Sequence, residues 1–380
     1  PCGAAPKPMR TASAEAAAAA ALFHPVRLGP LELANRIAMA PMSRYLCPDG
    51  VPHDGVAAYY RRRAENGVGL IVTEGTYVGH PTAASYDGVP FFAGEAALDG
   101  WAKVRAAVHG AGGRIFPQLW HTGSFRQSWM GPVKGVPGIG PSANLNAFTD
   151  HPEPTQAMTE ADVAAVIDAY AQAAADAQRL GFDGVEVHGA HGYLIDEFFW
   201  ERTNRRSDRY GGDRRGRTRF AVEVIEAIRR RVGPHFPVSL RFSQWKQQDY
   251  TAKLAETPGV LAEILEPLVD AGLTVLHASS RRFWEPAFPA ENDLTIAGWT
   301  KKISGLPVIM VGGAGLDRPG LKEALPASLE LLEKPLAREE FDVLAVGRAL
   351  LADPEWVLKA RAGELAACRP YTKDLLEKLD

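Results

Sequence analysis

The chain alternates short, continuously apolar runs with longer stretches in which apolar residues recur every three or four positions. A strand buried on both faces gives a continuous apolar run, whereas spacing of three and four residues indicates a helix. Strands that alternate with helices build βα units and a parallel sheet. Eight such runs predict strands at 36–42, 70–75, 114–120, 184–189, 237–243, 274–279, 307–313 and 343–348.

The stretch 159–180 gives the clearest helical signal between these runs. Thr159 and Asp162 have the spacing of an N-cap and its capping-box partner, and Gly181 stands where a helix stop is expected. Two further helices are expected, one from Phe220 to Val232 before Gly233 and one over 259–271 before Gly272.

Eight strand–helix repeats that close on themselves make a (β/α)₈ TIM barrel. We therefore predict an α/β fold with a single barrel over residues 22–364 and extended loops after the third and sixth strands, at 121–157 and 280–292. Loops of this length in a compact domain are typically functional or disordered. The alternative is a doubly wound sheet, but no G-x-G-x-x-G pattern follows the first strand.

The two ends of the chain are expected to lie outside this barrel. Residues 1–21 are rich in alanine and are predicted to be a disordered extension, whereas 365–380 are predicted to be a tail. Residues 1–8 precede the first methionine, Met9, and are interpreted as an added or processed end. The extension has no leucine-rich core of a secretory signal, so we expect a cytoplasmic protein, or an organellar one if the extension derives from a transit peptide.

Composition narrows the range of partners. Apolar residues make up 46% and charged residues 23% of the 380, which is typical of a globular protein with a sizeable core. The net charge of −3 gives no basic field for nucleic acid or a membrane. The arginine-rich stretch 202–219 includes Asp208 and Asp213, which indicates a solvated or ion-paired face. We expect small-molecule partners and leave open whether the protein is a monomer or a homodimer.

The three cysteines, Cys2, Cys47 and Cys368, are far apart and form no CxxC pair. This pattern argues against a disulfide scaffold, a zinc site and an iron–sulfur cluster, and it is compatible with a reducing compartment.

Polar and glycine residues follow the apolar runs, at the strand ends where barrels place their active sites. Arg241 lies inside an apolar run, and a buried guanidinium needs an acceptor or anionic partner. Glycines after the seventh and eighth strands let backbone N–H groups approach an anion, which favours a phosphate-bearing ligand. The set comprises Ser43, Gly75, Gln118, His188, Arg241, Gly312, Gly313, Gly347 and Arg348.

The segment 188–193 (HGAHGY) places His188, His191 and Tyr193 at the end of the fourth strand. A metal site would need a third ligand, and only Asp196 or Glu197 is nearby, so no metal is predicted. A structural pair of histidines bonded to backbone remains an alternative. The functional interpretation is two imidazole donors directed at a carbonyl or nitro oxygen, with a phenol as proton donor.

The stretches 36–45, 118–120, 186–212 and 345–348 together resemble the Old Yellow Enzyme family of FMN-dependent ene-reductases, and the resemblance extends over residues 22–360. It implies FMN at the barrel mouth and NAD(P)H as electron donor. It also implies reduction of activated C=C bonds in α,β-unsaturated carbonyl, imide or nitro compounds by ping-pong hydride transfer.

The same resemblance implies a role for each matching residue of the flavin site. Ser43 matches a Thr or Cys on the flavin O4 side, which leaves the flavin potential open. Ala40, Pro41 and Met42 would pack on the isoalloxazine, with Gly75 near its edge and Gln118 on its pyrimidine ring. Arg241 would lie near N1 and O2 and stabilise negative charge there. The phosphate would be held by Gly312, Gly313, Gly347 and Arg348.

On the substrate side, the resemblance implies that His188 and His191 hold the electron-withdrawing oxygen and that Tyr193 protonates Cα after hydride reaches Cβ. Tyr45 matches a substrate-side residue of one branch of the family and Trp120 a residue of another. Phe283 and Trp284 are expected to line the pocket, although loop-core packing is the alternative for both.

Three other functions remain alternatives. A dienoyl-CoA reductase-like FMN barrel would carry a cysteine cluster, which this sequence does not show. An aldolase or isomerase that binds a phosphate ligand would need a strand-end lysine, and none is evident. A non-catalytic flavin-binding protein would bind FMN without oxidising NAD(P)H.

Overall fold

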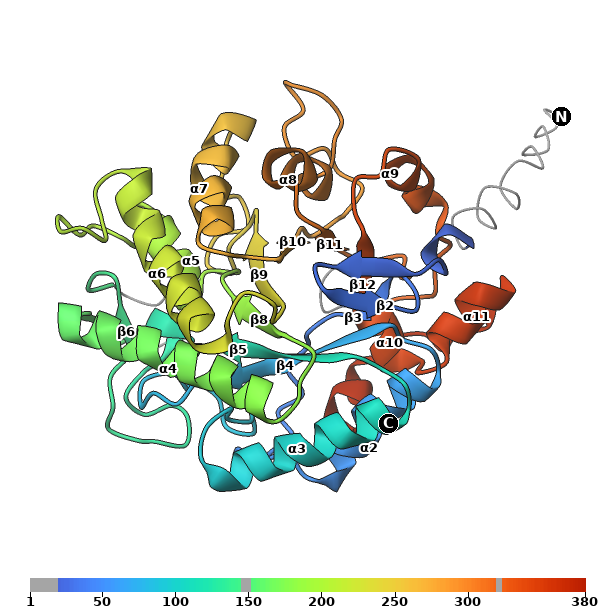
Figure 1. Ribbon diagram of the computed structural model, residues 1–380, viewed down its shortest axis with the longest axis horizontal. Coiled ribbons are helices and arrows are strands. Elements are labelled where there is room, and N and C mark those ends of the chain that lie inside the picture. Colours follow the sequence, from blue (N-terminus) through green and yellow to red (C-terminus); the bar gives the residue numbers. More distant parts are fainter. Residues whose placement is uncertain (1–19, 145–151, 319–322) are drawn as a thin grey trace, which may run out of the picture.

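The computed structural model describes residues 20–144, 152–318 and 323–380. Eight parallel strands close into one barrel with helices around it, which confirms the predicted TIM barrel (Figure 1). Each strand overlaps one predicted apolar run. In order around the barrel they are β3 (Ile37–Met39), β4 (Leu70–Tyr77), β5 (Ile115–Trp120), β8 (Val185–His188), β9 (Val238–Ser243), β10 (Val275–Ser279), β11 (Val308–Val311) and β12 (Val343–Val346).

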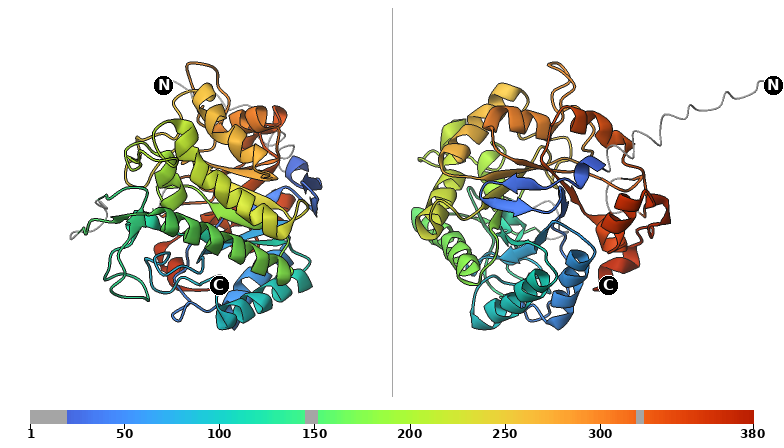
Figure 2. Two further views of the ribbon diagram at one scale, coloured as in Figure 1. Left: turned by 60° about the vertical axis from the view of Figure 1, so that its left-hand side comes forward. Right: turned by 45° about the vertical axis from the view of Figure 1, so that its right-hand side comes forward.

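The helices form the outer layer of the barrel, as the turned views show (Figure 2). Among the described residues, six helices have nine residues or more: α2 (Asp54–Glu65), α3 (Glu95–Gly110), α4 (Glu160–Arg179), α6 (Arg214–Val232), α7 (Pro258–Asp270) and α8 (Ile296–Ser304). Shorter ones are α5 (Leu194–Phe199), α9 (Glu333–Ala337), α10 (Arg348–Ala352) and α11 (Trp356–Ala362).

The predicted capping box of α4 is present. Thr159 Oγ accepts a hydrogen bond from Asp162 N at 3.1 Å, and the Asp162 carboxylate accepts one from Thr159 N at 2.8 Å. The pair satisfies two backbone donors that the first turn would otherwise leave without partners. Gly181 follows the helix with φ 82°, a conformation that glycine adopts without steric cost.

A short hairpin before the barrel, β1 (Val26–Leu28) and β2 (Leu31–Leu33), was not predicted. Leu28 and Leu33 are fully buried and share one apolar cluster with Leu70 and Val343, the first residues of β4 and β12. The hairpin therefore closes the end of the barrel where the strands begin. Runs of three residues are too short to show a periodicity, which is why the sequence did not reveal it.

The two predicted long loops differ in structure. After β5 the chain contains a 3₁₀ turn (Gly123–Phe125) and two two-residue strands, β6 (Ile139–Gly140) and β7 (Gln156–Ala157), which pair with each other. Residues 145–151 of this loop lie outside the described residues. After β10, the loop runs to Thr295, the N-cap of α8.

Residues 365–380, predicted to be a tail, pack against the barrel. Tyr371 is fully buried and pairs with Ala324, and Arg44 Nη2 donates to Leu375 O at 2.8 Å. The segment includes two 3₁₀ turns, Leu365–Ala367 and Lys373–Glu377. Most of the predicted N-terminal extension lies outside the described residues. Within the described part of the chain, no helix is both long and apolar enough to cross a bilayer.

Replacing Thr159 with alanine should lower the free energy of unfolding by about 1 kcal/mol, because the first turn of α4 loses its cap. Urea denaturation of the wild type and the variant measures the difference. Thr159→Ser keeps the hydroxyl and should remain within a few tenths of a kcal/mol of the wild type. A loss in the serine variant as large as in the alanine variant would contradict the capping role.

Candidate functional site

A cavity lies at the ends of the barrel strands, where β3, β4, β5, β8 and β9 deliver polar side chains to one place. Nine of its ten lining residues were predicted from the sequence, and the tenth, Gln247, was not. The lining consists of Pro41, Ser43, Gly75, Gln118, Trp120, His188, His191, Tyr193, Arg241 and Gln247.

Arg241 lies on β9 at the floor of this cavity. Among the described residues its one hydrogen bond is a long one, from Nη2 to Ser279 Oγ at 3.5 Å, and its buried Nε has no partner there. Burial lowers the pKa of Arg241 to about 10, and the Glu186 carboxylate partly offsets this. A guanidinium remains charged at that value, so the site holds a cation with unused donors.

Glu186 is the counter-charge, and it is fully buried on β8. It accepts hydrogen bonds from Gln118 Nε2 at 2.9 Å and Ser239 Oγ at 3.1 Å, and His277 Nδ1 lies 2.7 Å from its Oε2. Burial alone would raise the pKa of Glu186, but His277 and Arg241 bring it below its usual value. Because the Gln118 amide nitrogen donates to Glu186, the amide oxygen is left as an acceptor for a ligand.

The two predicted histidines lie side by side, with ring centroids 5.4 Å apart and ring planes nearly perpendicular. Burial, reinforced by Arg241, lowers the pKa of His188 to about 3 and that of His191 well below its usual value, so both rings are neutral near pH 7. Ala190 N donates to His188 Nδ1 at 3.3 Å, which places the His188 proton on Nε2. His191 Nε2 lies 3.0 Å from Ser279 Oγ.

Tyr193 packs between Trp120, at 4.8 Å between ring centroids, and Phe125, at 4.6 Å. Its hydroxyl accepts a hydrogen bond from Gln247 Nε2 at 3.0 Å. Burial raises the pKa of Tyr193 well above 10, so the phenol retains its proton near neutral pH. Because a donor already occupies one side of the oxygen, the phenol proton is free to point to another acceptor.

A buried ion pair holds the turn between the histidines and Tyr193. Lys246 Nζ and the Asp196 carboxylate are paired and fully buried, and Asp196 Oδ2 also accepts from Gly192 N at 2.7 Å. His191 has φ 64°, a left-handed conformation that costs energy for a side chain with a Cβ. The ion pair beside it supplies local structure that can keep this turn fixed. Lys246 is a buried lysine just after a core strand, a feature that the sequence did not make evident.

The loop after β3 carries Ser43 to the cavity, while Tyr45 is half-exposed and outside the cavity wall. Tyr45 has φ 57°, and the loop is held from below by the buried carboxylate of Glu74, whose Oε2 accepts from Arg44 N at 2.9 Å. Burial raises the pKa of Glu74 to about 7, although Arg44 acts to lower it.

The predicted phosphate-binding glycines follow the neighbouring strands β11 and β12. A Cβ on Gly312 would lie 2.8 Å from Ser280 O and 2.9 Å from Phe283 N, so a side chain here would clash with fixed backbone atoms. Gly313 has φ 81° and more open surroundings, and a Cβ on Gly347 would lie 3.4 Å from the Met42 sulfur.

The Arg348 side chain donates to Arg318 O at 2.6 Å. Ala40, at the start of the β3 loop, is fixed by its N–H donating to Val346 O at 2.9 Å.

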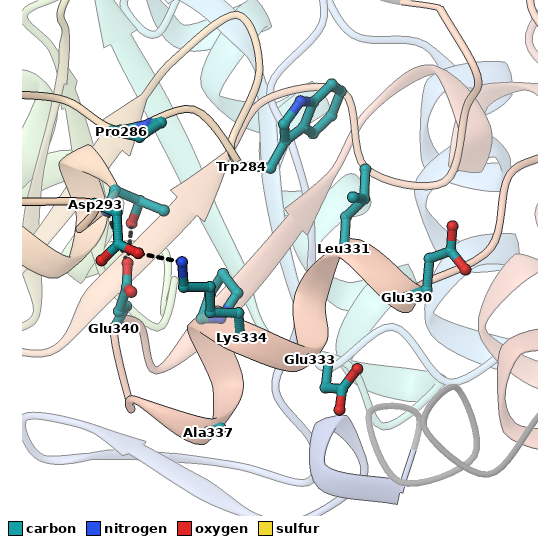
Figure 3. Close-up of a pocket in the computed structure, with 11 residues that line it drawn as sticks. Trp284, Pro286, Asp293, Glu330, Leu331, Glu333, Lys334, Ala337 and Glu340 are labelled. Carbon is teal, nitrogen blue, oxygen red and sulfur yellow. Dashed lines mark hydrogen bonds and ion pairs between the residues drawn. The ribbon is translucent and has the colours of Figure 1, made fainter. Parts of the chain in front are cut away.

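Phe283 and Trp284, predicted to line the pocket, are not in the cavity wall. Phe283 is buried, and its N–H donates to Gly312 O at 3.0 Å. Trp284 lies at the rim of a separate hollow on the outer side, between the loop after β10 and α9 (Figure 3). There Lys334 is paired with Asp293, as the dashed line shows.

Asp196 and Glu197, the only candidates for a third metal ligand, have other partners. Asp196 is paired with Lys246, and Glu197 accepts from Ser124 N at 3.2 Å. Across the described ranges, no group of three or more His, Cys, Asp or Glu side chains is arranged to hold a metal ion.

The structure adds Glu186, His277, Trp245 and Gln247 to the predicted site. Glu186 and His277 stand inside predicted strands, so the reasoning that a buried charge needs a partner, applied to Arg241, could have found them. Trp245 stacks on His191 at 4.4 Å between ring centroids. Trp245 and Gln247 lie in a loop, where no periodicity indicates which side chains turn inward.

Comparison with known proteins places this arrangement in a family. The model of the NADH:flavin oxidoreductase / NADH oxidase family matches residues 21–365. An NADH oxidase from Thermoanaerobacter brockii is 35% identical over 350 residues. That match covers 90% of this chain but only 51% of the relative, so the chain spans about half the length of that protein.

Two solved structures share the fold over nearly the whole chain. Morphinone reductase, in complex with tetrahydroNAD, superposes with a TM-score of 0.79 at 30% identity and 93% coverage of each chain. The Old Yellow Enzyme homologue from Zymomonas mobilis gives a TM-score of 0.78 at 27% identity, covering 95% of this chain and 99% of that one.

The buried carboxylate of Glu74 should make stability depend on pH. Its pKa is 4.5 in an unfolded chain and about 7 here, so the folded state binds the proton more tightly. Its contribution is therefore most favourable below pH 4.5 and is lost as the pH rises through 7. Between pH 5 and 8 the wild type should lose roughly 2–3 kcal/mol from this group.

Urea denaturation of the wild type and Glu74→Gln at the two pH values measures this effect. The glutamine does not titrate, so the variant should lose less stability over the same interval. Parallel pH profiles for the two proteins would show that Glu74 does not titrate in this range.

Proposed function

This chain belongs to the NADH:flavin oxidoreductase / NADH oxidase family of Old Yellow Enzyme-like proteins, and on that premise we propose that it is an FMN-dependent ene-reductase driven by NAD(P)H. The substrates would be α,β-unsaturated carbonyl, imide or nitro compounds. The observation that carries the proposal is the buried, charged Arg241, whose Nε has no partner among the described residues, beside a glutamine whose amide oxygen is free.

The residues around the cavity fit an FMN. A flavin pyrimidine ring has carbonyl oxygens that accept hydrogen bonds and one N–H that donates, and Arg241 and the Gln118 oxygen offer the complementary groups. The backbone at Gly313 and Gly347 and the Arg348 guanidinium would hold the phosphate, since glycine leaves backbone N–H groups accessible. Residues 40–42 and Ser43 would lie along the ring edge.

The chemistry that a bound flavin would supply is transfer of a hydride from NAD(P)H to the β-carbon of the substrate. The chain's own residues manage charge and protons around that transfer. His188, with its proton on Nε2, and His191 would donate hydrogen bonds to the carbonyl or nitro oxygen. Neutral donors in a water-poor site stabilise negative charge as it develops on that oxygen.

Tyr193 would deliver the proton that completes the reduction. Hydride adds to Cβ, the electrons of the C=C bond move toward the activating oxygen, and the phenol proton then bonds to Cα. The net reaction consumes one NAD(P)H, one proton and one alkene. Gln247 donates to the phenol oxygen, which favours release of the phenol proton and directs it away from Gln247.

Replacing Arg241 with methionine should abolish FMN retention or weaken it by at least tenfold, because the cavity loses its cation. Titration of purified protein with FMN, followed by flavin fluorescence, measures the affinity. Arg241→Lys keeps the charge without the planar fork and should retain intermediate affinity. A wild-type protein that neither carries nor takes up FMN would overturn the proposed function.

Tyr193→Phe should leave flavin reduction by NADPH unchanged and slow flavin reoxidation by cyclohexenone about 10²–10⁴-fold, the range expected for loss of a general acid. Stopped-flow absorbance under anaerobic conditions separates the two half-reactions. Gln247→Leu removes the donor to the phenol and should slow the same half-reaction to a smaller extent. Unchanged reoxidation in Tyr193→Phe would exclude Tyr193 as the proton donor.

A further inference from the structure

Residues 372–380 form a strap that runs beside α2 at the outside of the barrel (Figure 1). A Cβ on Gly55, in the first turn of α2, would lie 3.6 Å from Leu379 Cδ1. Leu375, Leu376 and Leu379 are partly buried and pack against the apolar core. The strap is therefore attached to the barrel through three apolar side chains.

Arg44, in the loop after β3, depends on this strap for its side-chain hydrogen bonds. The residue is 2% exposed, and its Nη2 donates to Leu375 O at 2.8 Å, to Leu376 O at 3.4 Å and to Lys378 O. Its Nε and Nη1 have no partner among the described residues. Every hydrogen bond of this guanidinium within the described ranges therefore goes to the strap. Because a buried cation needs acceptors, Arg44 and the strap hold each other in place.

The position of Arg44 matters because of the residues that precede it. It directly follows Ser43, which lines the cavity, and residues 40–43 are the loop expected to lie along the flavin ring. The Arg44 backbone N–H donates to Glu74 Oε2 at 2.9 Å. The loop leaves β3 at one end, and at the other end it is anchored twice, by Glu74 through the main chain and by the strap through the side chain.

Arg63, on α2, connects the same strap to the other end of the proposed flavin site. It is fully buried, and its Nη1 donates to Asp380 O. Its Nη2 donates to Leu350 O and to Leu351 O, each at 3.2 Å. Both carbonyls belong to α10, the short helix that begins at Arg348, one of the residues proposed to hold the phosphate. Arg63 therefore ties the strap to the phosphate end of the site.

The two arginines share one aromatic ring. The Tyr59 ring centroid lies 4.9 Å from Arg44 Cζ and 3.8 Å from Arg63 Cζ, and Tyr59 is 1% exposed. The electron-rich face of a buried ring attracts a cation, so Tyr59 favours the placement of both guanidinium groups near each other. The strap, the two arginines and Tyr59 thus form one connected unit between the ring end and the phosphate end.

We propose that the strap is a positioning element for FMN, which sets the loop at the flavin ring through Arg44 and the helix at the phosphate through Arg63. The inference rests on the proposed function and adds to it residues outside the cavity lining. Both arginines are positioning residues. Because they act on different ends of one cofactor, their loss should have different signatures.

Titration of the protein with FMN and with riboflavin, followed by flavin fluorescence, tests this division, because riboflavin has the ring without the phosphate. Arg44→Met should weaken the binding of both flavins by about the same factor, on the order of tenfold, since only the loop at the ring is released. Arg63→Met should weaken FMN more than riboflavin. The ratio of the two affinities therefore stays constant in the first variant and falls in the second.

Three further variants serve as controls. Arg44→Lys keeps a cation that can donate to the strap carbonyls and should recover part of the affinity for both flavins. Leu379→Ala loosens the strap without removing a buried charge and should weaken FMN in the same direction, so it decides the question if an arginine variant does not fold. Lys373→Ala, at an exposed position of the strap, should bind both flavins as the wild type does.

Wild-type affinity for both flavins in Leu379→Ala and in folded Arg44→Met would overturn the inference, even if urea denaturation showed a lower free energy of unfolding. A ratio of FMN to riboflavin affinity that falls in Arg44→Met but not in Arg63→Met would also contradict it. Failure of the proposed function has a different signature, because the wild-type protein would then bind neither flavin. One set of titrations therefore distinguishes the two failures.

Discussion

The site is organised around the buried guanidinium of Arg241, a positive charge that needs a compensating negative charge inside the barrel. Arg241 stands on a core strand, and Glu186 on the neighbouring strand supplies the opposite charge. Removing either one would leave an uncompensated ion in a low-dielectric interior, which typically costs several kcal/mol. Glu186 in turn fixes Gln118 and contacts His277. Side chains from four strands are thereby held in one polar network. Because the network fixes their orientations, it also fixes the shape of the cavity that they line.

Much of this arrangement could be predicted from the sequence, because the carboxyl ends of all strands meet at one end of a parallel barrel. All eight apolar runs overlap strands of the barrel, and nine residues that lie within or shortly after these runs line one cavity. The first strand was overestimated most: it ends at Met39, because residues 40–42 leave the sheet as the loop that carries Ser43. The seventh and eighth predicted strands also extend two residues beyond the observed ends at Val311 and Val346. The β1–β2 hairpin went unseen because its strands are three residues long.

The parts that escaped prediction lie where no periodic pattern constrains the side chain. Nothing in the order of residues 244–250 indicates that Trp245 stacks on a histidine, or that Gln247 reaches the Tyr193 hydroxyl. Phe283 and Trp284, aromatic residues of a long loop that were expected to line the pocket, are not among the residues that line this cavity. One is buried beside Gly312, and the other borders an outer hollow. Tertiary contacts, rather than local sequence, decide such positions.

The β1–β2 hairpin limits the side from which small molecules can reach the cavity. Leu28 and Leu33 pack over the barrel where its strands begin, so the cavity beside Arg241 is closed from that end. Under the proposed function, the hydride donor and the substrate would use the same face of the site from the opposite end, and each would have to leave before the other could bind. An excess of the donor would therefore keep the substrate out, and an excess of the substrate would keep the donor out. The turnover rate would then depend on the ratio of the two concentrations as well as on each concentration.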